Sequence, residues 1–391
     1  MQAAALNPRP LLLHKKSDCL QLKNILFLTL KVFSATGGIE KVCRIAGKAM
    51  YENALRLNKR LMLMSMHDKL EDSFDNPYFP SEIFRGCGAR KIQFVVKAVQ
   101  EGMGADVVVL SHINLLLVGW LIKKISPATK VILFCHGIEV WQQLPFFKRR
   151  MLQCIDEFEC VSKYTAEKII SVQGISPAKC KLLNNCLDPF LPLPKNVDLK
   201  TTPYKQYGFK NGDTILFTLT RLASTERYKG YDKVLEALSA INRPHVKYLV
   251  AGSYDEAEKK FLDDKVISLG LQNQVITAGF VSEADLAAYF MMSDIYVMPS
   301  SKEGFGIVFI EAMFYGLPVI AGNADGSVDA LLNGALGQLV DPRSAVEIKH
   351  ALEKILENTK QFKPDEARLM QNFGYDAYKM RINDMLLRVS A

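Results

Sequence analysis

Two glutamates eight positions apart carry the strongest chemical signal in this sequence of 391 residues. Glu303 and Glu311 lie in SSKEGFGIVFIEAMFYGLPVI, residues 300–320, a stretch rich in glycine, aromatic and aliphatic residues. The segment before it has the apolar, β-branched character of a buried strand, and the segment from Phe305 to Tyr315 has the length and composition of a helix. We therefore expect Glu303 in a loop at the carboxyl end of a strand and Glu311 inside the following helix.

A carboxylate in so apolar a segment needs a partner. Leaving it ionised and unpaired costs several kcal/mol, so it must pair with a cation, accept hydrogen bonds or become neutral. For Glu311 alone, a structural ion pair is the simpler interpretation. Two carboxylates at a strand end, beside a helix N-terminus with glycines at positions 304 and 306, favour a ligand-binding role.

Glycines and cations follow other predicted strands. Gly37 and Gly38 in VFSATGGIEKV let the backbone approach a ligand and expose N–H groups at the start of a helix. Arg221 and Lys229 follow the first strand of the second half, where two cations would neutralise a diphosphate and stabilise the charge that develops as it departs. His136, after the strand KVILFC, suits a structural or a catalytic role equally well.

Each of these interpretations has a simpler alternative in which the residues have no ligand-binding role. The two glycines could form a tight turn, and either cation could be a solvated surface charge. Arg227, between the two cations, is expected to be such a surface charge.

The sequence predicts no tightly held metal and no resident cofactor. It has no D-x-D triplet that could hold a metal at a diphosphate, and its eight cysteines show no C-x-x-C spacing. Scattered cysteines of this kind are typical of reduced thiols in a cytoplasm.

Composition and charge narrow the class of protein. With 49% hydrophobic and 23% charged residues, the chain is typical of a soluble globular protein, and no apolar run reaches the ~18 residues of a membrane-spanning helix. The first residues lack the order of a secretory signal, so we expect a cytoplasmic protein. Residues 1–200 carry 28 Lys and Arg against 17 Asp and Glu, whereas residues 201–391 carry 21 against 24. The basic half suggests nucleic acid, an anionic membrane surface or a solvated face, but no nucleic-acid-binding motif is present.

Short apolar segments alternate with segments long enough for helices, which predicts two parallel sheets. The predicted strands are residues 24–30, 60–66, 106–111, 130–135, 157–161, 213–220, 246–252, 274–280, 294–299 and 318–322. Prolines from Pro189 to Pro203 interrupt the pattern and mark a linker. The predicted fold is α/β, with two doubly wound Rossmann-like domains facing across a cleft. The predicted parts are a lead-in (1–23), a first domain (24–188), a linker (189–212), a second domain (213–372) and a C-terminal helix (373–391).

The motifs together resemble the retaining glycosyltransferases of family 4, which have the GT-B fold. E-G-F-G-I-V-F-I-E is a Glu-x7-Glu motif, accompanied by the T-G-G-I-E loop, the H-G-I-E segment and R-L-x5-Y-K-G. The resemblance covers nearly the whole chain from about Asn24. Within the family, ERYKGYDK and GNADGSVDALLNG are similar to bacterial exopolysaccharide mannosyltransferases.

The resemblance implies roles for individual residues. Glu311 would bind the ribose hydroxyls of a sugar nucleotide, and Glu303 would face the donor sugar near its reacting carbon, where His136 would also contact it. Arg221 and Lys229 would grip the diphosphate. The implied catalytic residues are thus Glu303, His136, Lys229 and Arg221.

Backbone groups would complete the site. By the same resemblance, N–H groups of residues 305–307 would hold sugar hydroxyls or phosphate, the backbone near Phe280 would receive the base, and Gly38 would meet the diphosphate from the first domain. The implied substrate-binding residues are Gly37, Gly38, Phe280, Val281, Gly304, Phe305, Gly306, Ile307 and Glu311. The last helix, from about Tyr375, would cross back to the first domain.

The sequence departs from the family pattern in two places. The spacing between Arg221 and Lys229 is longer than usual, which makes the role of Arg221 less secure. Asp329 stands where a glutamate is more usual, which leaves the role of that loop open.

The resemblance implies transfer of a hexose from a nucleotide sugar to a hydroxyl acceptor, with retention at the anomeric carbon and no bound metal. GDP-mannose is the expected donor, UDP-hexoses are alternatives, and the expected acceptor is a lipid-linked saccharide of polysaccharide synthesis. One rival is an NAD-dependent epimerase or reductase, because Tyr164 and Lys168 have the Y-x-x-x-K spacing of short-chain dehydrogenases. A second rival is a non-catalytic sugar-nucleotide-binding protein.

A membrane surface is a further expected partner. The segment WQQLPFFKRRML, residues 141–152, places Trp141 and two phenylalanines beside three cations. Aromatic rings can enter the membrane interface while cations meet anionic headgroups. The alternative is a helix packed on its own sheet with a solvated basic edge. We expect reversible docking of the first domain on the inner face of the membrane.

Overall fold

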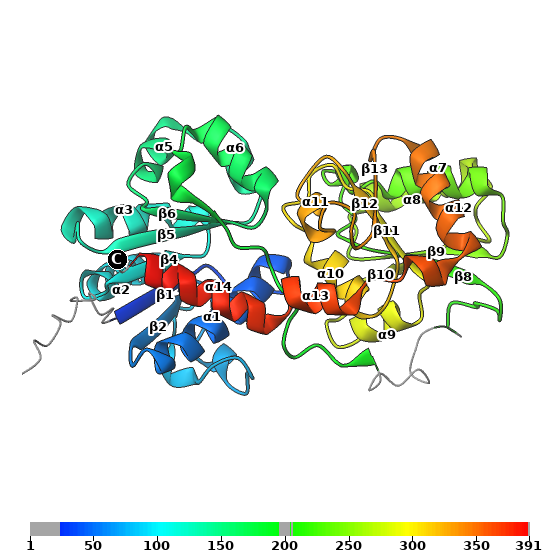
Figure 1. Ribbon diagram of the computed structural model, residues 1–391. Coiled ribbons are helices and arrows are strands. Elements are labelled where there is room, and N and C mark those ends of the chain that lie inside the picture. Colours follow the sequence, from blue (N-terminus) through cyan, green and yellow to red (C-terminus); the bar gives the residue numbers. More distant parts are fainter. Residues whose placement is uncertain (1–23, 195–203, 205, 390–391) are drawn as a thin grey trace, which may run out of the picture.

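The structure is a computed structural model that describes residues 24–194, 204 and 206–389 (Figure 1). It consists of two domains, each built on one parallel sheet with helices on both faces. The predicted lead-in and part of the predicted linker lie outside the described residues.

The first domain contains a seven-stranded sheet in the order β3-β2-β1-β4-β5-β6-β7. Its strands are β1 (Asn24–Thr29), β2 (Arg60–Ser65), β3 (Phe84–Gly86), β4 (Val107–Leu110), β5 (Lys130–Cys135), β6 (Glu157–Cys160) and β7 (Cys180–Leu182). Its helices are α1 (Gly38–Arg56), α2 (Lys91–Met103), α3 (Leu116–Ile125), α4 (Ile138–Trp141), α5 (Phe146–Leu152) and α6 (Lys163–Gln173). Alternate residues of β1 enter the two cores, Ile25 and Phe27 on one face and Leu26 and Leu28 on the other.

The second domain contains a six-stranded sheet in the order β10-β9-β8-β11-β12-β13. Its strands are β8 (Thr214–Leu219), β9 (Val246–Ala251), β10 (Val275–Gly279), β11 (Ile295–Met298), β12 (Val319–Gly322) and β13 (Gln338–Val340). The helices after the linker are α7 (Tyr231–Ile241), α8 (Glu256–Ser268), α9 (Leu286–Met291), α10 (Ile307–Phe314), α11 (Ser327–Ala330), α12 (Ala345–Glu357), α13 (Glu366–Phe373) and α14 (Tyr375–Arg388).

The two parallel sheets confirm the predicted α/β fold. All ten predicted strands are present, and each predicted end lies within one residue of the observed end. The strands that the prediction missed, β3, β7 and β13, have three residues each and lie at sheet edges. A strand this short shows too little of the two-residue period to be recognised.

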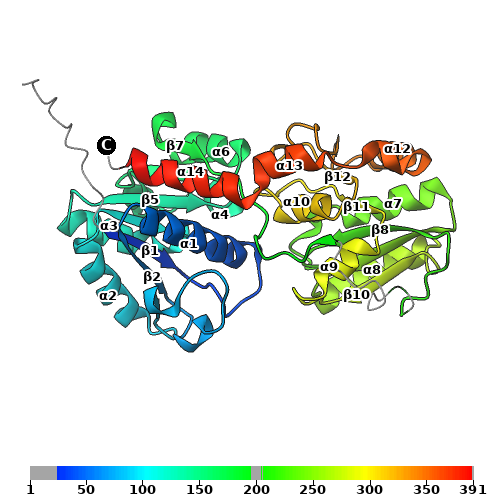
Figure 2. The same cartoon turned by 60° about the horizontal axis from the view of Figure 1, so that its bottom comes forward.

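The last helix lies against the first domain, beside α1, in both views of the ribbon (Figures 1 and 2). Phe373 still packs in the core of the second domain, whereas Tyr378 and Ile382 pack in the core of the first. The chain therefore leaves the second domain at the junction of α13 and α14. Among the described residues, no helix has the length and apolar character needed to cross a membrane.

A buried charge cluster fastens α14 to β6. Arg388 donates to Glu159 at 2.6 Å and to Glu157 at 3.0 Å. Glu159 is almost fully buried, and burial together with its neighbour Glu157 raises the pKa of Glu159 to about 8, although Arg388 acts in the opposite direction. Burial and Glu157 therefore favour the protonated form of Glu159.

This raised pKa predicts how stability depends on pH. The folded protein keeps the Glu159 proton up to about pH 8, while the unfolded chain releases it near the ordinary value of 4.5, so stability should fall as pH rises between these values. We expect the melting temperature of Glu159→Gln to fall less than that of the wild type from pH 5 to pH 8, by about 2 °C or more. Glu52→Gln, which removes a carboxylate of α1 that pairs with Lys379 of α14, is the control. Parallel pH profiles would contradict the prediction.

Candidate active site

A cleft of about 440 Å³ lies between the two domains, at the carboxyl ends of both sheets. Loops after β1 and β5 line it from the first domain, and loops after β8, β9, β10 and β11 line it from the second. The structure thereby brings together all but one of the predicted site residues: Gly37, Gly38, His136, Arg221, Lys229, Phe280, Val281, Glu303, Phe305, Gly306, Ile307 and Glu311.

Glu303 and Lys229 form an ion pair in this cleft. Their Oε2 and Nζ atoms are 2.5 Å apart, and both side chains are mostly buried. Burial by itself lowers the pKa of Lys229, but Glu303 outweighs burial and the net pKa is raised. The ammonium group therefore stays protonated and is held at a fixed point.

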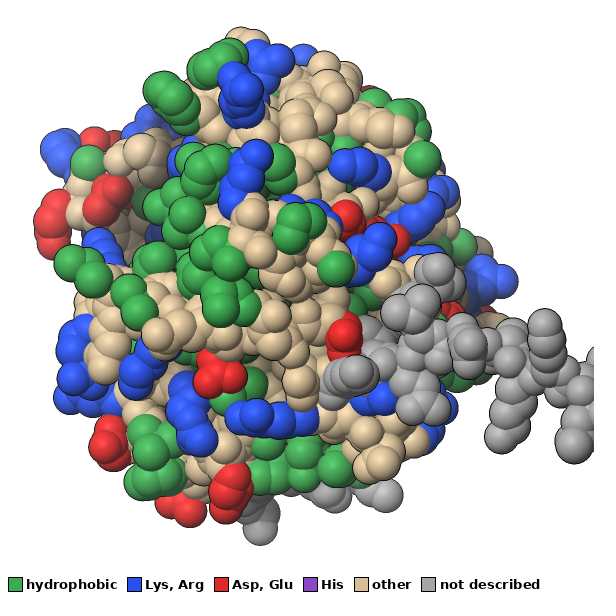
Figure 3. Space-filling model, turned by 90° about the vertical axis from the view of Figure 1, so that its left-hand side faces the viewer, with side chains coloured by type: hydrophobic (Ala, Val, Ile, Leu, Met, Phe, Trp, Pro, Cys, Tyr) green, Lys and Arg blue, Asp and Glu red, His purple; other side chains and the backbone are tan. Residues whose placement is uncertain are grey.

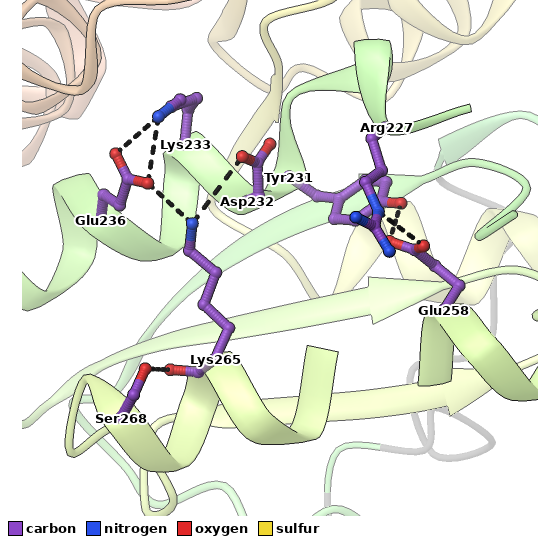
Figure 4. A network of polar contacts seen from close by, with 8 residues as sticks. All are labelled: Arg227, Tyr231, Asp232, Lys233, Glu236, Glu258, Lys265 and Ser268. Carbon is purple, nitrogen blue, oxygen red and sulfur yellow. Dashed lines mark hydrogen bonds and ion pairs between the residues drawn. The ribbon is translucent and has the colours of Figure 1, made fainter. Parts of the chain in front are cut away.

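The turn that carries Lys229 is anchored on both sides of it by Glu258 (Figure 4). Arg227 donates to Glu258 Oε2 at 2.9 Å, and the Tyr231 hydroxyl donates to its Oε1 at 2.5 Å. Glu258 is fully buried, and the Arg227 guanidinium lies 3.7 Å from the centre of the Phe261 ring. Arg227 is exposed, as expected, with 44% of its side chain accessible, but it also pairs with this buried carboxylate, which the sequence did not predict.

A second group of charges ties the two helices behind this turn together (Figure 4). Lys265 of α8 pairs with Glu236 at 2.7 Å and with Asp232 at 3.8 Å, both on α7. Lys233 pairs with Glu236 at 3.0 Å. These pairs hold α7, which begins directly after the Lys229 turn, against α8.

The loop that carries Glu303 is held by Asp325, which the sequence analysis did not single out. Asp325 accepts hydrogen bonds from the backbone N–H of Glu303 at 2.6 Å and of Ser327 at 2.9 Å. Burial raises the pKa of Asp325 to about 6. The only sequence signal was its place in the loop after the next strand, which lies at the same edge of the sheet.

Glu311 has a partner from the other domain. The Nζ of Lys41, in the first turn of α1, lies 2.6 Å from its Oε1, and the two side chains are 12% and 5% exposed. Burial alone lowers the pKa of Lys41, yet the attraction of Glu311 prevails and the net pKa is raised. The ion pair expected for a lone buried carboxylate is present, and it spans the cleft. Lys41 was missed because nothing in its local sequence connects it with Glu311.

His136 and Gly304 meet where the domains touch. His136 Nε2 lies 2.7 Å from the Ser111 carbonyl, and the backbone N–H of His136 donates to Glu139 at 2.6 Å. A Cβ atom on Gly304 would lie 1.9 Å from the carbonyl oxygen of His136. Gly304 is the predicted site residue that does not line the cleft, because it is in backbone contact with the opposite domain.

The remaining predicted residues differ in how exposed they are and in their backbone conformation. Arg221 is 70% exposed and pairs with Glu226 at 3.1 Å. Phe280 is 66% exposed at the cleft, whereas the Phe305 side chain is buried in the core. Gly306 adopts φ 84°, a left-handed conformation that suits glycine, and α10 begins immediately after it with its free N–H groups.

The residues behind the dehydrogenase alternative lie elsewhere. Tyr164 and Lys168 are on α6, where the Tyr164 ring packs against Trp141 with 4.9 Å between ring centres and the Lys168 ammonium lies over it. Neither residue lines the cleft. Within the described ranges, no group of three or more His, Cys, Asp or Glu is arranged to hold a metal ion.

Residues 201–380 match the family described as glycosyl transferases group 1. This match covers the second domain. The matched residues include the Lys229–Glu303 pair and Glu311.

Curated relatives of this chain include two transferases. It is 30% identical over 259 residues to the GDP-mannose-dependent alpha-(1-6)-phosphatidylinositol monomannoside mannosyltransferase of Mycolicibacterium smegmatis, an alignment that covers 62% of this chain and 64% of that protein. It is 30% identical over 145 residues to the 2-deoxystreptamine N-acetyl-D-glucosaminyltransferase of Niallia circulans, covering 37% of this chain and 36% of that protein. This chain thus spans less than two thirds of either relative.

Solved structures share the fold over most of the chain. Anabaena Alr3699/HepE in complex with UDP-glucose superposes with a TM-score of 0.72 at 21% identity, covering 93% of this chain and 99% of that one. Sucrose-phosphate synthase from Thermosynechococcus elongatus gives 0.70 at 18% identity, covering 94% and 99%. These neighbours and the two facing sheets confirm the predicted GT-B fold.

Proposed function

We propose that this protein is a glycosyltransferase that moves a hexose from a nucleotide sugar to a hydroxyl acceptor with retention at the anomeric carbon. The observation that carries the proposal is the Lys229–Glu303 pair beside the N-terminus of α10, in a cleft between two domains. A fixed ammonium group and free N–H groups at a helix N-terminus suit a diphosphate whose negative charge grows as it leaves the sugar.

We propose a front-face route, in which the glutamates of the cleft act as ion-pair partners and not as nucleophiles. All four glutamates that line it are paired with cations: Glu226 with Arg221, Glu283 with Arg44, Glu303 with Lys229 and Glu311 with Lys41. A covalent route with retention needs a carboxylate nucleophile beside the reacting carbon. In the proposed route the leaving phosphate accepts the acceptor's proton, and the protein contributes positioning and charge stabilisation.

GDP-mannose is the proposed donor. The Mycolicibacterium relative is named as a GDP-mannose-dependent mannosyltransferase, which supports this choice. The Anabaena neighbour with bound UDP-glucose makes a UDP-hexose the alternative. Transfer from GDP-mannose but not from UDP-glucose to a lipid-linked saccharide extract, measured with labelled sugar, tests the proposal. Binding of a sugar nucleotide without transfer would instead support a non-catalytic binding protein.

Metal independence is a separate expected result. Lys229 and the N-terminus of α10 can together take the place of a divalent cation at the diphosphate. We expect transfer activity to be unchanged, within about twofold, in excess EDTA. Loss of activity that only Mg²⁺ or Mn²⁺ restores would contradict this expectation.

We further propose that the acceptor comes from a membrane. Figure 3 shows the end of the first domain, where hydrophobic side chains are bordered by Lys and Arg. On α5, Phe146 and Phe147 are 68% and 74% exposed beside Lys148, Arg149 and Arg150, so the helix does not bury its rings against its own sheet. The neighbouring helix α3 adds the exposed Leu117 and Ile125.

Vesicle co-sedimentation tests this docking. We expect the protein to bind vesicles that contain anionic lipid, and we expect Lys148, Arg149 and Arg150 changed together to Glu to weaken binding at least tenfold, since each basic residue near an anionic surface contributes about 1 kcal/mol. Lys260, Arg343 and Lys354 of the second domain, changed together to Glu, are the matched control. Equal recovery in the supernatant with anionic and neutral vesicles would favour a soluble acceptor.

A further inference from the structure

Two cations on one face of α1 reach across to the second domain. Lys41 pairs with Glu311 of α10 at 2.6 Å. Three residues later, Arg44 pairs with Glu283 at 2.9 Å, and Arg44 also donates to the carbonyl of Val32 at 3.1 Å. Residues three apart lie on the same side of a helix, so this side of α1 faces the cleft.

Both glutamates line the cleft in the part of the second domain where the nucleoside is expected. Glu283 follows Phe280 and Val281 in the loop after β10, where the base is expected, and Glu311 lies where the ribose is expected. Lys41 and Glu283 both line the cleft as well. The first domain therefore borders the proposed nucleoside site. Its Lys41 is in direct contact with Glu311, the residue predicted to bind the ribose.

We propose that Lys41 is a positioning residue of the donor site, which holds the Glu311 carboxylate from the opposite domain in the orientation that accepts the ribose 2′- and 3′-hydroxyls. This inference rests on the proposed use of a sugar nucleotide. A carboxylate offers about four lone-pair sites, and Lys41 occupies one of them on Oε1, which leaves sites on both oxygens for a diol.

Lys41 also supplies the charge that the buried carboxylate requires. Glu311 is 4% exposed, and its neighbours on α10 are apolar, so without Lys41 its negative charge would be uncompensated. A carboxylate that takes up a proton or turns away loses charge-assisted acceptance from the ribose. The alternative is that the pair only holds the domains together. These two roles differ in one measurable respect, which is the preference for ribose over a sugar without the two hydroxyls.

Titration calorimetry with a nucleoside diphosphate and its 2′,3′-dideoxy analogue distinguishes a positioning role of Lys41 from a purely structural one. GDP and UDP are first titrated into the wild-type protein, and the tighter one is used in both forms. We expect the wild type to bind the ribose form at least tenfold more tightly than the dideoxy form, and Lys41→Met to reduce this preference to about twofold or less. Lys41→Arg should keep part of the preference. Lys48→Met, which removes a second glutamate-paired lysine of α1 outside the cleft, should keep all of it.

A double-mutant cycle completes the test. If Lys41 acts through Glu311, Glu311→Gln should itself remove the ribose preference, and adding Lys41→Met should change it no further. Melting curves check that each variant is folded, and Lys41→Gln replaces Lys41→Met if the latter does not fold. Equal weakening of both nucleotide forms by Lys41→Met, with the preference intact, would overturn the inference and leave the proposed function standing. A wild-type protein that binds neither GDP nor UDP would instead overturn the proposed function itself.

Discussion

Replacing Lys229 by alanine should lower the rate of sugar transfer about 100- to 1,000-fold, the loss typical of removing one preorganised group that stabilises developing charge. The ammonium group is mostly buried and fixed by Glu303, and its turn is anchored to Glu258. Because charge on the leaving diphosphate grows toward the transition state, kcat should fall more than donor binding weakens. Steady-state kinetics together with donor titration measure the two effects.

Two variants serve as comparisons for Lys229→Ala. Lys260→Ala, on α8, removes an exposed lysine that pairs with Asp264 outside the cleft and should leave the rate unchanged. Arg221→Ala should cost less than Lys229→Ala, because Arg221 is 70% exposed and solvent already screens its charge. Equal losses in kcat and in donor affinity for Lys229→Ala, or no loss in either, would rule out the proposed role of Lys229.

Gly304→Ala is expected to reduce kcat/KM about 100-fold although it adds only one methyl group, because a shift of about 1 Å in a catalytic loop can cost this much. The new Cβ would lie 1.9 Å from the His136 carbonyl oxygen and 3.3 Å from the Cα of Gly137. Both neighbours are backbone atoms of the other domain, so the loop carrying Glu303 must move away from the first domain. The measurements are kcat/KM and the unfolding temperature, each determined for Gly304→Ala and for the wild type.

The unfolding temperature of Gly304→Ala should change little, since the substitution lies at the contact between domains and not in either core. Gly104→Ala is the control, because its Cβ would meet only the Glu101 carbonyl oxygen at 3.8 Å, an ordinary contact. Full activity of Gly304→Ala would show that the contact between His136 and Gly304 is not needed for catalysis.

The sequence by itself was enough to predict the central strands of both sheets and the positions of the site residues that follow them. Residues 130–135 and 246–251 are buried on both faces of a parallel sheet, so they form apolar runs that can be recognised locally. Parallel strands present their carboxyl ends at one edge, and His136, Arg221 and Glu303 each come shortly after a strand. Chain order and strand direction bring each of them to the carboxyl edge of its own sheet, and the facing of the two domains brings both edges to one cleft.

Only the tertiary structure decided which charges pair. Lys41 and Glu311 are 270 residues apart, and Arg227 and Glu258 are 31 apart, so neither pair lies within the span of a helical or strand period. Gly304 was expected to contact the substrate, and the approach of the two domains places it against His136. Local sequence determines the period with which side chains are buried, whereas the partner of a buried charge depends on how separate elements pack. That packing is the sum of many weak, non-directional contacts, and no short segment specifies it.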